Sequence, residues 1–219
     1  MKFDTRTLQI LRNFSSINQS IIFKNGRKLR TISSSKSVFA EAEIPFEIEK
    51  LFAIYNLPQF LSAISLFENP ELILGDSSVT IKSGKEKLSY VYSEPSLIMS
   101  PSDKTLTLPS IDIEFMLKSE TLTKVQKALG VIGLPEIAIV GDGEKIYVTA
   151  CNSKNSSESS YRIEVGETDL TFKLIFLAEN VNLLPGDYEA KICSKGIAQF
   201  KGPEVCYWIM VESNSEFPS

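Results

Sequence analysis

The sequence predicts an α+β protein assembled from two copies of one folding unit of about 115 residues. Each half opens with apolar residues at helical spacing, and strands that alternate apolar and polar residues follow. Landmarks of the two halves match in order at nearly constant offset: Asn25-Gly26 precedes Asp142-Gly143 by 117 residues, and Phe52 precedes Phe172 by 120. Two unrelated α+β domains of similar size are the alternative to this internal duplication.

The first half is expected to begin with an amphipathic helix over residues 4–17, which Asp4 or Thr5 caps. At about 100° per residue its inward residues are Leu8, Leu11, Phe14 and Ile17. The later expected elements are, in chain order, a hairpin around Asn25-Gly26 (Ser20–Phe23 with Lys28–Ile32), an alternating strand Val38–Ile44, a strand Leu51–Leu57, a short helix from Pro58 to about Phe67, and two or three strands that end at Tyr92.

A proline-rich connector separates the halves, because Pro95, Pro101 and Pro109 disfavour strand ladders. We therefore assign domains to residues 1–93 and 113–219, joined by the connector 94–112. The second domain repeats the order of the first. Its expected elements are a helix Glu120–Ile132 with Leu122, Val125, Leu129 and Ile132 inward, a hairpin around Asp142-Gly143, a polar loop Asn152–Ser160, strands Tyr161–Val165 and Leu170–Leu177, a helical segment Ala178–Leu184, two or three strands ending near Val211, and a frayed tail Glu212–Ser219.

Composition excludes several classes of chemistry. The 219-residue chain has no histidine, which rules out histidine general bases, Ser-His-Asp and Cys-His machinery and histidine metal ligands. Its three cysteines, without CxxC spacing, are typical of buried thiols in a reducing compartment. No signal peptide or membrane span is evident, so we expect a soluble cytoplasmic protein with no membrane partner.

The remaining short motifs are weak. Gly141-Asp142-Gly143 lacks the third glycine of a dinucleotide fingerprint and is expected to be a hairpin turn. The pairs Glu41 with Glu43 and Asp112 with Glu114 lack a third ligand for Mg²⁺ and are expected to face solvent. We therefore expect no metal site, no cofactor and no enzymatic activity.

The polar faces of the two repeated helices carry cations and amides. Residues 1–30 hold seven Lys or Arg and one Asp, in a chain whose net charge is −4. This segregation of charge favours a polyanion as the partner of the basic faces. The expected DNA-contacting residues are Arg6, Arg12, Lys124 and Lys127.

These features together resemble DNA polymerase sliding clamps of the PCNA-like fold, and in particular the trimeric clamps of T-even-type bacteriophages. The similarity covers the chain to about Val211 and departs from the family mainly in the connector and the Ser-rich loops. The stretches that carry it are Thr7–Asn18, Phe39–Ile44, Ala53–Leu61 and Leu184–Tyr188.

The resemblance implies a homotrimeric ring whose helices line the hole and whose antiparallel sheets lie outside. It implies sequence-independent contact with double-stranded DNA, an ATP-dependent clamp loader, and tethering of a viral replicative DNA polymerase in the bacterial host cytoplasm. In the phage family, late-transcription factors are further partners.

The resemblance also implies where contacts form. The strand Lys87–Tyr92 is expected to pair with Tyr161–Val165 of a neighbour, through Leu88, Tyr90, Tyr92, Tyr161 and Ile163. Clients of clamps insert a hydrophobic peptide beside the connector, which points to Ile98 and Met99.

A β-rich oligomeric structural or interaction protein of a virion, without a DNA role, is the alternative function. One observation distinguishes the two functions. A clamp stays on closed or end-blocked DNA and is lost from linear DNA with free ends, whereas a protein that binds DNA directly is insensitive to the ends.

Overall fold

The computed structural model describes residues 1–155 and 159–218. The chain divides into two compact units, Met1–Asp103 and Lys104–Ser219. The division falls inside the connector predicted at 94–112. The polar loop predicted at Asn152–Ser160 lies partly outside the described residues. No helix within the described ranges is both long and apolar enough to cross a membrane.

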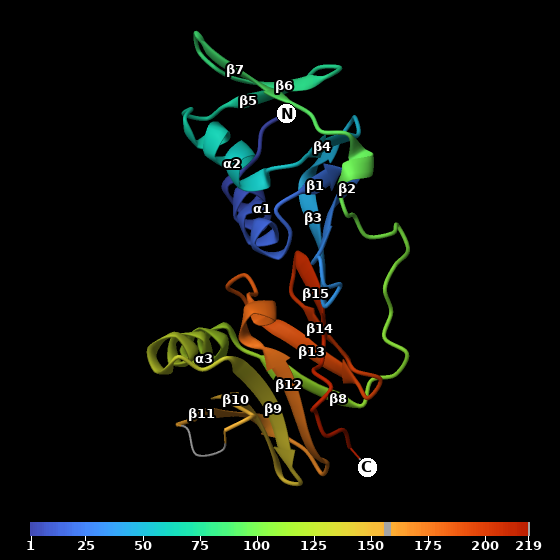
Figure 1. The fold of residues 1–219 in the computed structure, drawn as a ribbon, viewed down its shortest axis with the longest axis vertical. Coiled ribbons are helices and arrows are strands. Elements are labelled where there is room, and N and C mark those ends of the chain that lie inside the picture. Colours follow the sequence, from blue (N-terminus) through green and yellow to red (C-terminus); the bar gives the residue numbers. More distant parts are fainter. Residues whose placement is uncertain (156–158, 219) are drawn as a thin grey trace. The chain divides into compact units, whose positions relative to one another are not determined.

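Unit 1 contains two α-helices and seven strands among its elements (Figure 1). They are α1 (Thr5–Ile17), β1 (Ile21–Phe23), β2 (Gly26–Ile32), β3 (Val38–Ile48), β4 (Phe52–Ile54), α2 (Leu57–Ser65), β5 (Glu71–Leu74), β6 (Ser78–Ser83), β7 (Glu86–Val91) and the 3₁₀ turn η1 (Pro95–Leu97). The predicted helix, the strand from Val38 and the helix opened by Pro58 are thus confirmed, and β3 continues past Pro45 to Ile48.

The core of unit 1 lies between the two helices and the strands. From α1, Ile10, Leu11 and Phe14 are buried, whereas Leu8, predicted to point inward, is only half-buried. The rings of Phe23 and Phe52 stack at 4.4 Å between β1 and β4. This burial is the main source of stability for a helix of 13 residues, which is marginal in isolation.

The prediction that Ser20–Phe23 and Lys28–Ile32 pair as a hairpin is wrong. β1 pairs with β4, and β2 pairs with β3. Gly26 takes a φ of +111°, and the Asn25 amide donates to the Glu49 carbonyl at 2.8 Å. Because Asn25 is anchored to a distant segment, Asn25-Gly26 forms a corner between two strand pairs instead of a tight two-residue turn.

Unit 2 repeats this order. Its elements are β8 (Ile113–Leu117), α3 (Ser119–Ile132), β9 (Glu136–Asp142), β10 (Lys145–Cys151), β11 (Tyr161–Glu167), β12 (Thr171–Leu177), the 3₁₀ turn η2 (Ala178–Val181), β13 (Tyr188–Cys193), β14 (Ile197–Lys201) and β15 (Val205–Met210).

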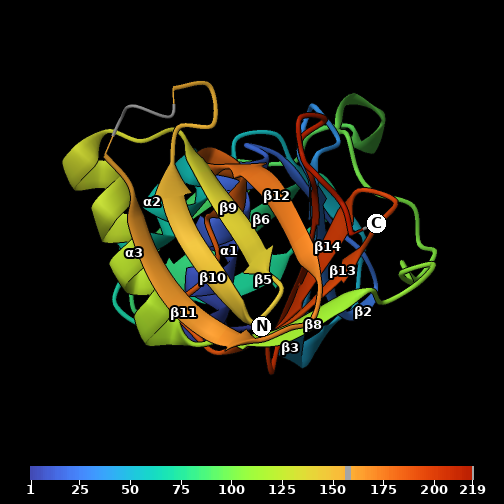
Figure 2. The same ribbon diagram turned by 90° about the horizontal axis from the view of Figure 1, so that it is seen from below.

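Two antiparallel sheets organise unit 2. One has the order β11-β10-β9-β12, and β15, β14, β13 and β8 neighbour one another in the second. The hairpin predicted at Asp142-Gly143 is confirmed as the β9–β10 turn, with Gly143 at a φ of +91°. Figure 2 shows α3 beside β10 and β11, and its Leu122, Val125 and Leu129 are buried.

Two expectations for unit 2 are wrong. Ile132, predicted to face inward, is 42% exposed because α3 ends there and Gly133 turns the chain with a φ of +76°. The tail is not frayed over its described residues. Glu216 exchanges two backbone hydrogen bonds with Lys173 of β12, at 2.8 and 2.7 Å, and the Glu212 amide donates to the Ile175 carbonyl.

The two units share one pairing scheme, which supports the predicted duplication. The pairs β1–β4 and β2–β3 correspond to β9–β12 and β10–β11. The meander β5-β6-β7 corresponds to β13-β14-β15. One pairing is added in unit 2, where β10 also pairs with β9.

Gly141 provides a test of the close packing between β9 and β12. A Cβ at this position would lie 2.7 Å from the Leu170 carbonyl oxygen and against the Phe172 ring. We expect Gly141→Ala to lower the free energy of unfolding by about 1–3 kcal/mol through overpacking.

Gly130→Ala on the exposed face of α3 is the matched control, since a methyl group added there would have nothing within 4 Å. It should raise the free energy of unfolding by about 0.5–1 kcal/mol. Urea unfolding of both variants measures the difference, and equal stabilities would contradict this packing.

Candidate nucleic-acid interface

The outward face of α1 is basic and amide-rich. Asp4 caps the helix by accepting the Thr7 amide at 2.7 Å, and this hydrogen bonding lowers the pKa of its carboxyl. Arg6 is half-buried, and its guanidinium donates to the Gln9 side chain at 3.4 Å. Arg12 is exposed and makes no ion pair among the described residues. This face therefore offers positive charge beside amide groups, a combination suited to phosphate oxygens.

The outward face of α3 is less purely basic than the sequence suggests. Lys124 and Lys127 are both exposed, but Lys124 forms an i,i+4 ion pair with Glu120. Hydrogen bonding to that carboxylate raises the pKa of Lys124. Glu120 therefore does more than complement the helix dipole, because it also neutralises part of this face. Lys127 makes no ion pair in the described structure, so its positive charge remains available on the outward face of α3.

The start of α3 is capped from a distant part of unit 2. No side chain of the N-cap residue Lys118 caps the helix. Instead Asp187 accepts the Ser119 amide at 2.8 Å and the Lys118 ammonium at 2.9 Å, which lowers the pKa of Asp187. The sequence does not predict this role of Asp187, because a cap 68 positions away leaves no local signal.

Much of the positive charge in residues 24–30 is neutralised within unit 1. Lys24 pairs with Asp103 at 2.7 Å, and Glu41 pairs with Lys28 at 2.8 Å and with Arg30 at 2.6 Å. The local excess counted from the sequence therefore does not form one basic surface, although Arg27 of β2 makes no ion pair among the described residues and donates instead to the Ile44 carbonyl at 3.1 Å.

The strands predicted to join subunits are edge strands. β7 ends the order β5-β6-β7, and β11 ends the order β11-β10-β9-β12. Tyr90 turns toward α2, where its hydroxyl donates to Gln59 at 3.0 Å, and Tyr92 packs on Phe52. Leu88 and Ile163 are half-buried, and Tyr161 is 37% exposed.

The predicted partner-binding pair separates in the structure. Ile98 is 7% exposed and anchors the connector to unit 1, whereas Met99 is 45% exposed. The Met99 carbonyl accepts a hydrogen bond from the Asn18 side chain, which ties this segment to the end of α1. Only the Met99 side chain presents substantial apolar surface to solvent at this pair.

Of the carboxylates predicted to face solvent in pairs, Glu41, Asp112 and Glu114 are engaged in structural contacts, whereas Glu43 is exposed and makes no ion pair among the described residues. Asp112 accepts the Ser194 amide at 2.6 Å, and Glu114 pairs with Lys191. No group of three candidate metal ligands occurs within the part of the chain described. The three cysteines are free thiols, and burial raises the pKa of Cys151.

The ion-pair triad at Glu41 predicts a pH-dependent stability. Partial burial alone would raise the pKa of Glu41, but hydrogen bonds from Lys28 and Arg30 outweigh it and leave the pKa below its ordinary value. The stabilisation is therefore present above the unfolded pKa of about 4.3 and disappears as the pH falls through the folded value. We expect Glu41→Gln to cost about 1–2 kcal/mol at pH 7 and little near pH 3, measured by urea unfolding.

Glu43→Gln is the matched control on the same strand, since Glu43 is exposed and makes no ion pair among the described residues. A cost for Glu41→Gln that did not change with pH would contradict the electrostatic origin of this contribution.

Comparison with known proteins agrees with this geometry. Models of the families DNA polymerase processivity factor and gp45 sliding clamp, C terminal, match residues 2–100 and 114–213. The sliding clamp of Vibrio phage KVP40 is 31% identical over 220 residues, covering 97% of this chain and all of the relative. That of Enterobacteria phage T4 is 27% identical, covering 98% of each chain.

Among solved structures, the PCNA of A. fulgidus, bound to the C-terminal region of FEN-1, superposes with a TM-score of 0.69 at 13% identity. The alignment covers 95% of this chain and 96% of that one. It confirms the predicted α+β clamp fold, and the sequence relatives confirm the resemblance to phage clamps. The chain belongs to the sliding clamp family of DNA polymerase processivity factors.

Proposed function

We propose that three copies of this chain close into a ring that encircles duplex DNA and tethers the replicative DNA polymerase of a phage in the cytoplasm of its bacterial host. The observation that carries the proposal is the pair of outward helix faces, one in each unit, on which Arg12 and Lys127 present exposed and unpaired charge. In a ring, these faces line the hole.

The charge distribution suits a protein that slides. Three copies of Arg6, Arg12, Lys124 and Lys127 place twelve cations around the hole, while three chains of net charge −4 give the ring −12 overall. Side chains that meet phosphates make contacts independent of sequence. The negative remainder disfavours DNA outside the ring, so topological linkage rather than tight binding supplies processivity.

Edge strands and exposed apolar residues support the trimer. β7 and β11 each leave one row of backbone groups without a strand partner in the described structure. Val91 of β7 is 71% exposed, and Leu66 at the end of α2 and Val131 of α3 are 72% and 77% exposed. Because the two edges differ, their pairing is head-to-tail, and such a contact repeated by rotation closes a ring.

The partners follow from the same role. We propose Met99 as the apolar contact for a hydrophobic peptide of the polymerase. The A. fulgidus clamp was solved with a client peptide, the C-terminal region of FEN-1, which supports this mode of binding. The further proposed partners are an ATP-dependent loader that opens the ring and late-transcription factors, and the clamp itself catalyses no reaction.

Reversing the helix charges tests the DNA track. We expect the fourfold variant Arg6→Glu, Arg12→Glu, Lys124→Glu and Lys127→Glu to lose loading or stimulation of the polymerase while its mass in solution stays that of a trimer. Primer extension with polymerase and loader measures the effect.

A variant with the same charge change off these helices is the control. Lys36, Lys104, Lys195 and Lys201 are exposed and form no ion pair among the described residues. Changing these four to Glu should leave processive synthesis largely intact. Processive synthesis by the first variant at the wild-type level would place the DNA track elsewhere.

Proline at Val91 tests the subunit contact. Ser77 accepts the Tyr92 amide at 3.0 Å, so by the alternation of antiparallel pairing the Val91 amide points away from β6 toward the open edge. Val91→Pro therefore removes an intersubunit donor without breaking the β6–β7 ladder. We expect its mass, measured by sedimentation, to shift from trimer toward monomer at concentrations where Val91→Thr stays trimeric. A Val91→Pro trimer of unchanged stability would refute this pairing.

A further inference from the structure

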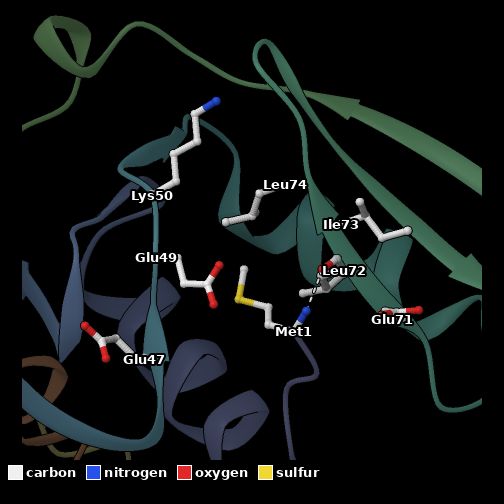
Figure 3. Close-up of a pocket in the computed structure, with 8 residues that line it drawn as sticks. All are labelled: Met1, Glu47, Glu49, Lys50, Glu71, Leu72, Ile73 and Leu74. Atoms are coloured by element: carbon white, nitrogen blue, oxygen red, sulfur yellow. Dashed lines mark hydrogen bonds between the residues drawn. The ribbon is translucent and has the colours of Figure 1, made fainter.

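A groove of about 500 Å³ opens in unit 1, on the outer edge of β5. Figure 3 shows the Met1 side chain in this groove, with the Glu49 carboxylate beside it and Leu74 above it in this view. Its lining comes from the N-terminus, the segment around the end of β3, and β5 (Met1, Glu47, Glu49, Lys50, Glu71, Leu72, Ile73 and Leu74).

The wall formed by β5 is an incompletely paired strand edge. Leu72 and Met1 exchange backbone hydrogen bonds in both directions, each at 2.8 Å. Outward-facing backbone groups recur at every second residue of an antiparallel strand, so those of Leu74 point the same way as those of Leu72. No backbone partner for Leu74 occurs on this side within the described residues. The groove therefore contains an available strand position at Leu74.

In unit 2, a strand occupies the position that corresponds to the open one beside Leu74. Leu72 and Leu74 correspond to Ala190 and Ile192 of β13, at the offset of 118 that also relates Gly84 to Gly202. β8 pairs with β13 along its whole length, and Ile113 lies opposite Ile192. The corresponding neighbour is missing beside Leu74 in the described structure, where the groove lies instead.

The charges around the groove select its occupant. Glu47, Glu49 and Glu71 are exposed, and none of them forms an ion pair among residues 1–155 and 159–218. Lys50 is already engaged, because its ammonium donates to Asp76 at 2.8 Å and to the Gly75 carbonyl at 2.9 Å. The Met1 amine likewise donates to the Leu72 carbonyl. These three exposed carboxylates, which have no ion-pair partner among the described residues, lie beside apolar Met1 and Leu74 and complement a segment that alternates basic and apolar residues.

We propose that this groove binds an extended basic segment of a partner protein by β-strand addition to β5. The backbone of the segment pairs with the amide and carbonyl of Leu74. In unit 2, Ile113 lies opposite Ile192 and the Asp112 amide donates to the Ile192 carbonyl at 3.0 Å. The apolar side chains of the segment pack against Leu74 and Met1, and its Lys or Arg side chains reach Glu47, Glu49 and Glu71. The contact is independent of the helix faces and of Met99.

A labelled nine-residue peptide of alternating lysine and valine tests the charge requirement with the full chain. We expect Glu47→Lys/Glu49→Lys to raise the Kd, measured by fluorescence anisotropy, by at least about tenfold, equivalent to roughly 1.4 kcal/mol. The control Glu43→Lys/Glu68→Lys makes the same charge change at exposed positions of unit 1 that do not line the groove, and should alter the Kd less than about twofold. Equal weakening by the two variants would mean nonspecific attraction and overturn the proposal.

The backbone requirement is tested on the peptide, so that protein folding is not affected. One peptide is N-methylated at its lysine amides and another at its valine amides. Because one set faces β5, only one of the two should lose binding, and hydrogen exchange at the Leu74 amide should slow when the unmethylated peptide binds. Equal affinity of both methylated peptides, or unchanged exchange at Leu74, would exclude strand addition at this groove.

Discussion

The burial of one apolar face of α1 and of α3 within their units determines how this protein presents its charge. Ile10, Leu11 and Phe14 fix the rotation of α1, and Leu122, Val125 and Leu129 fix that of α3. Each helix has 3.6 residues per turn, so a buried face of this kind dictates which residues point outward. The cations of both helices face solvent for this reason, and the proposed DNA track depends on it.

Ion pairs then decide which of the outward cations carry net charge. Glu41 pairs with Lys28 and Arg30, Asp103 pairs with Lys24, and Glu120 partly neutralises Lys124. Arg12 and Lys127 have no such partner within the described residues. Exposed pairs such as that of Lys124 contribute little to stability, and their carboxylates are screened and mobile. In the proposed DNA track, a phosphate would therefore compete with Glu120 for Lys124 at modest cost, as a sliding contact requires.

Strand edges are the second constraint that the duplicated unit must satisfy. In unit 2 the tail covers the edge of β12 through Glu212 and Glu216, and in unit 1 the Ser93 amide donates to Ala53 of β4 at the corresponding edge. β8 covers β13. The edges of β7, of β11 and of β5 at Leu74 have no comparable cover in the described structure. Uncovered edges invite association, and we propose that the first two pair with one another between subunits while the third receives a separate partner.

The sequence by itself determined the helices, most strands, the repeat and the basic helix faces. These features follow from local periodicity, from caps such as Asp4 and from turn residues such as Gly143, all of which act within a few positions. Tertiary structure decided what depends on residues distant in the chain. Asn25-Gly26 became a corner because Asn25 bonds to Glu49, α3 is capped by Asp187, and Ile98 is buried while Met99 is exposed. The unpaired position at Leu74 belongs to the same class, because an edge is defined only by which strands pair, and long-range hydrogen bonds and charges leave no periodic trace in the sequence.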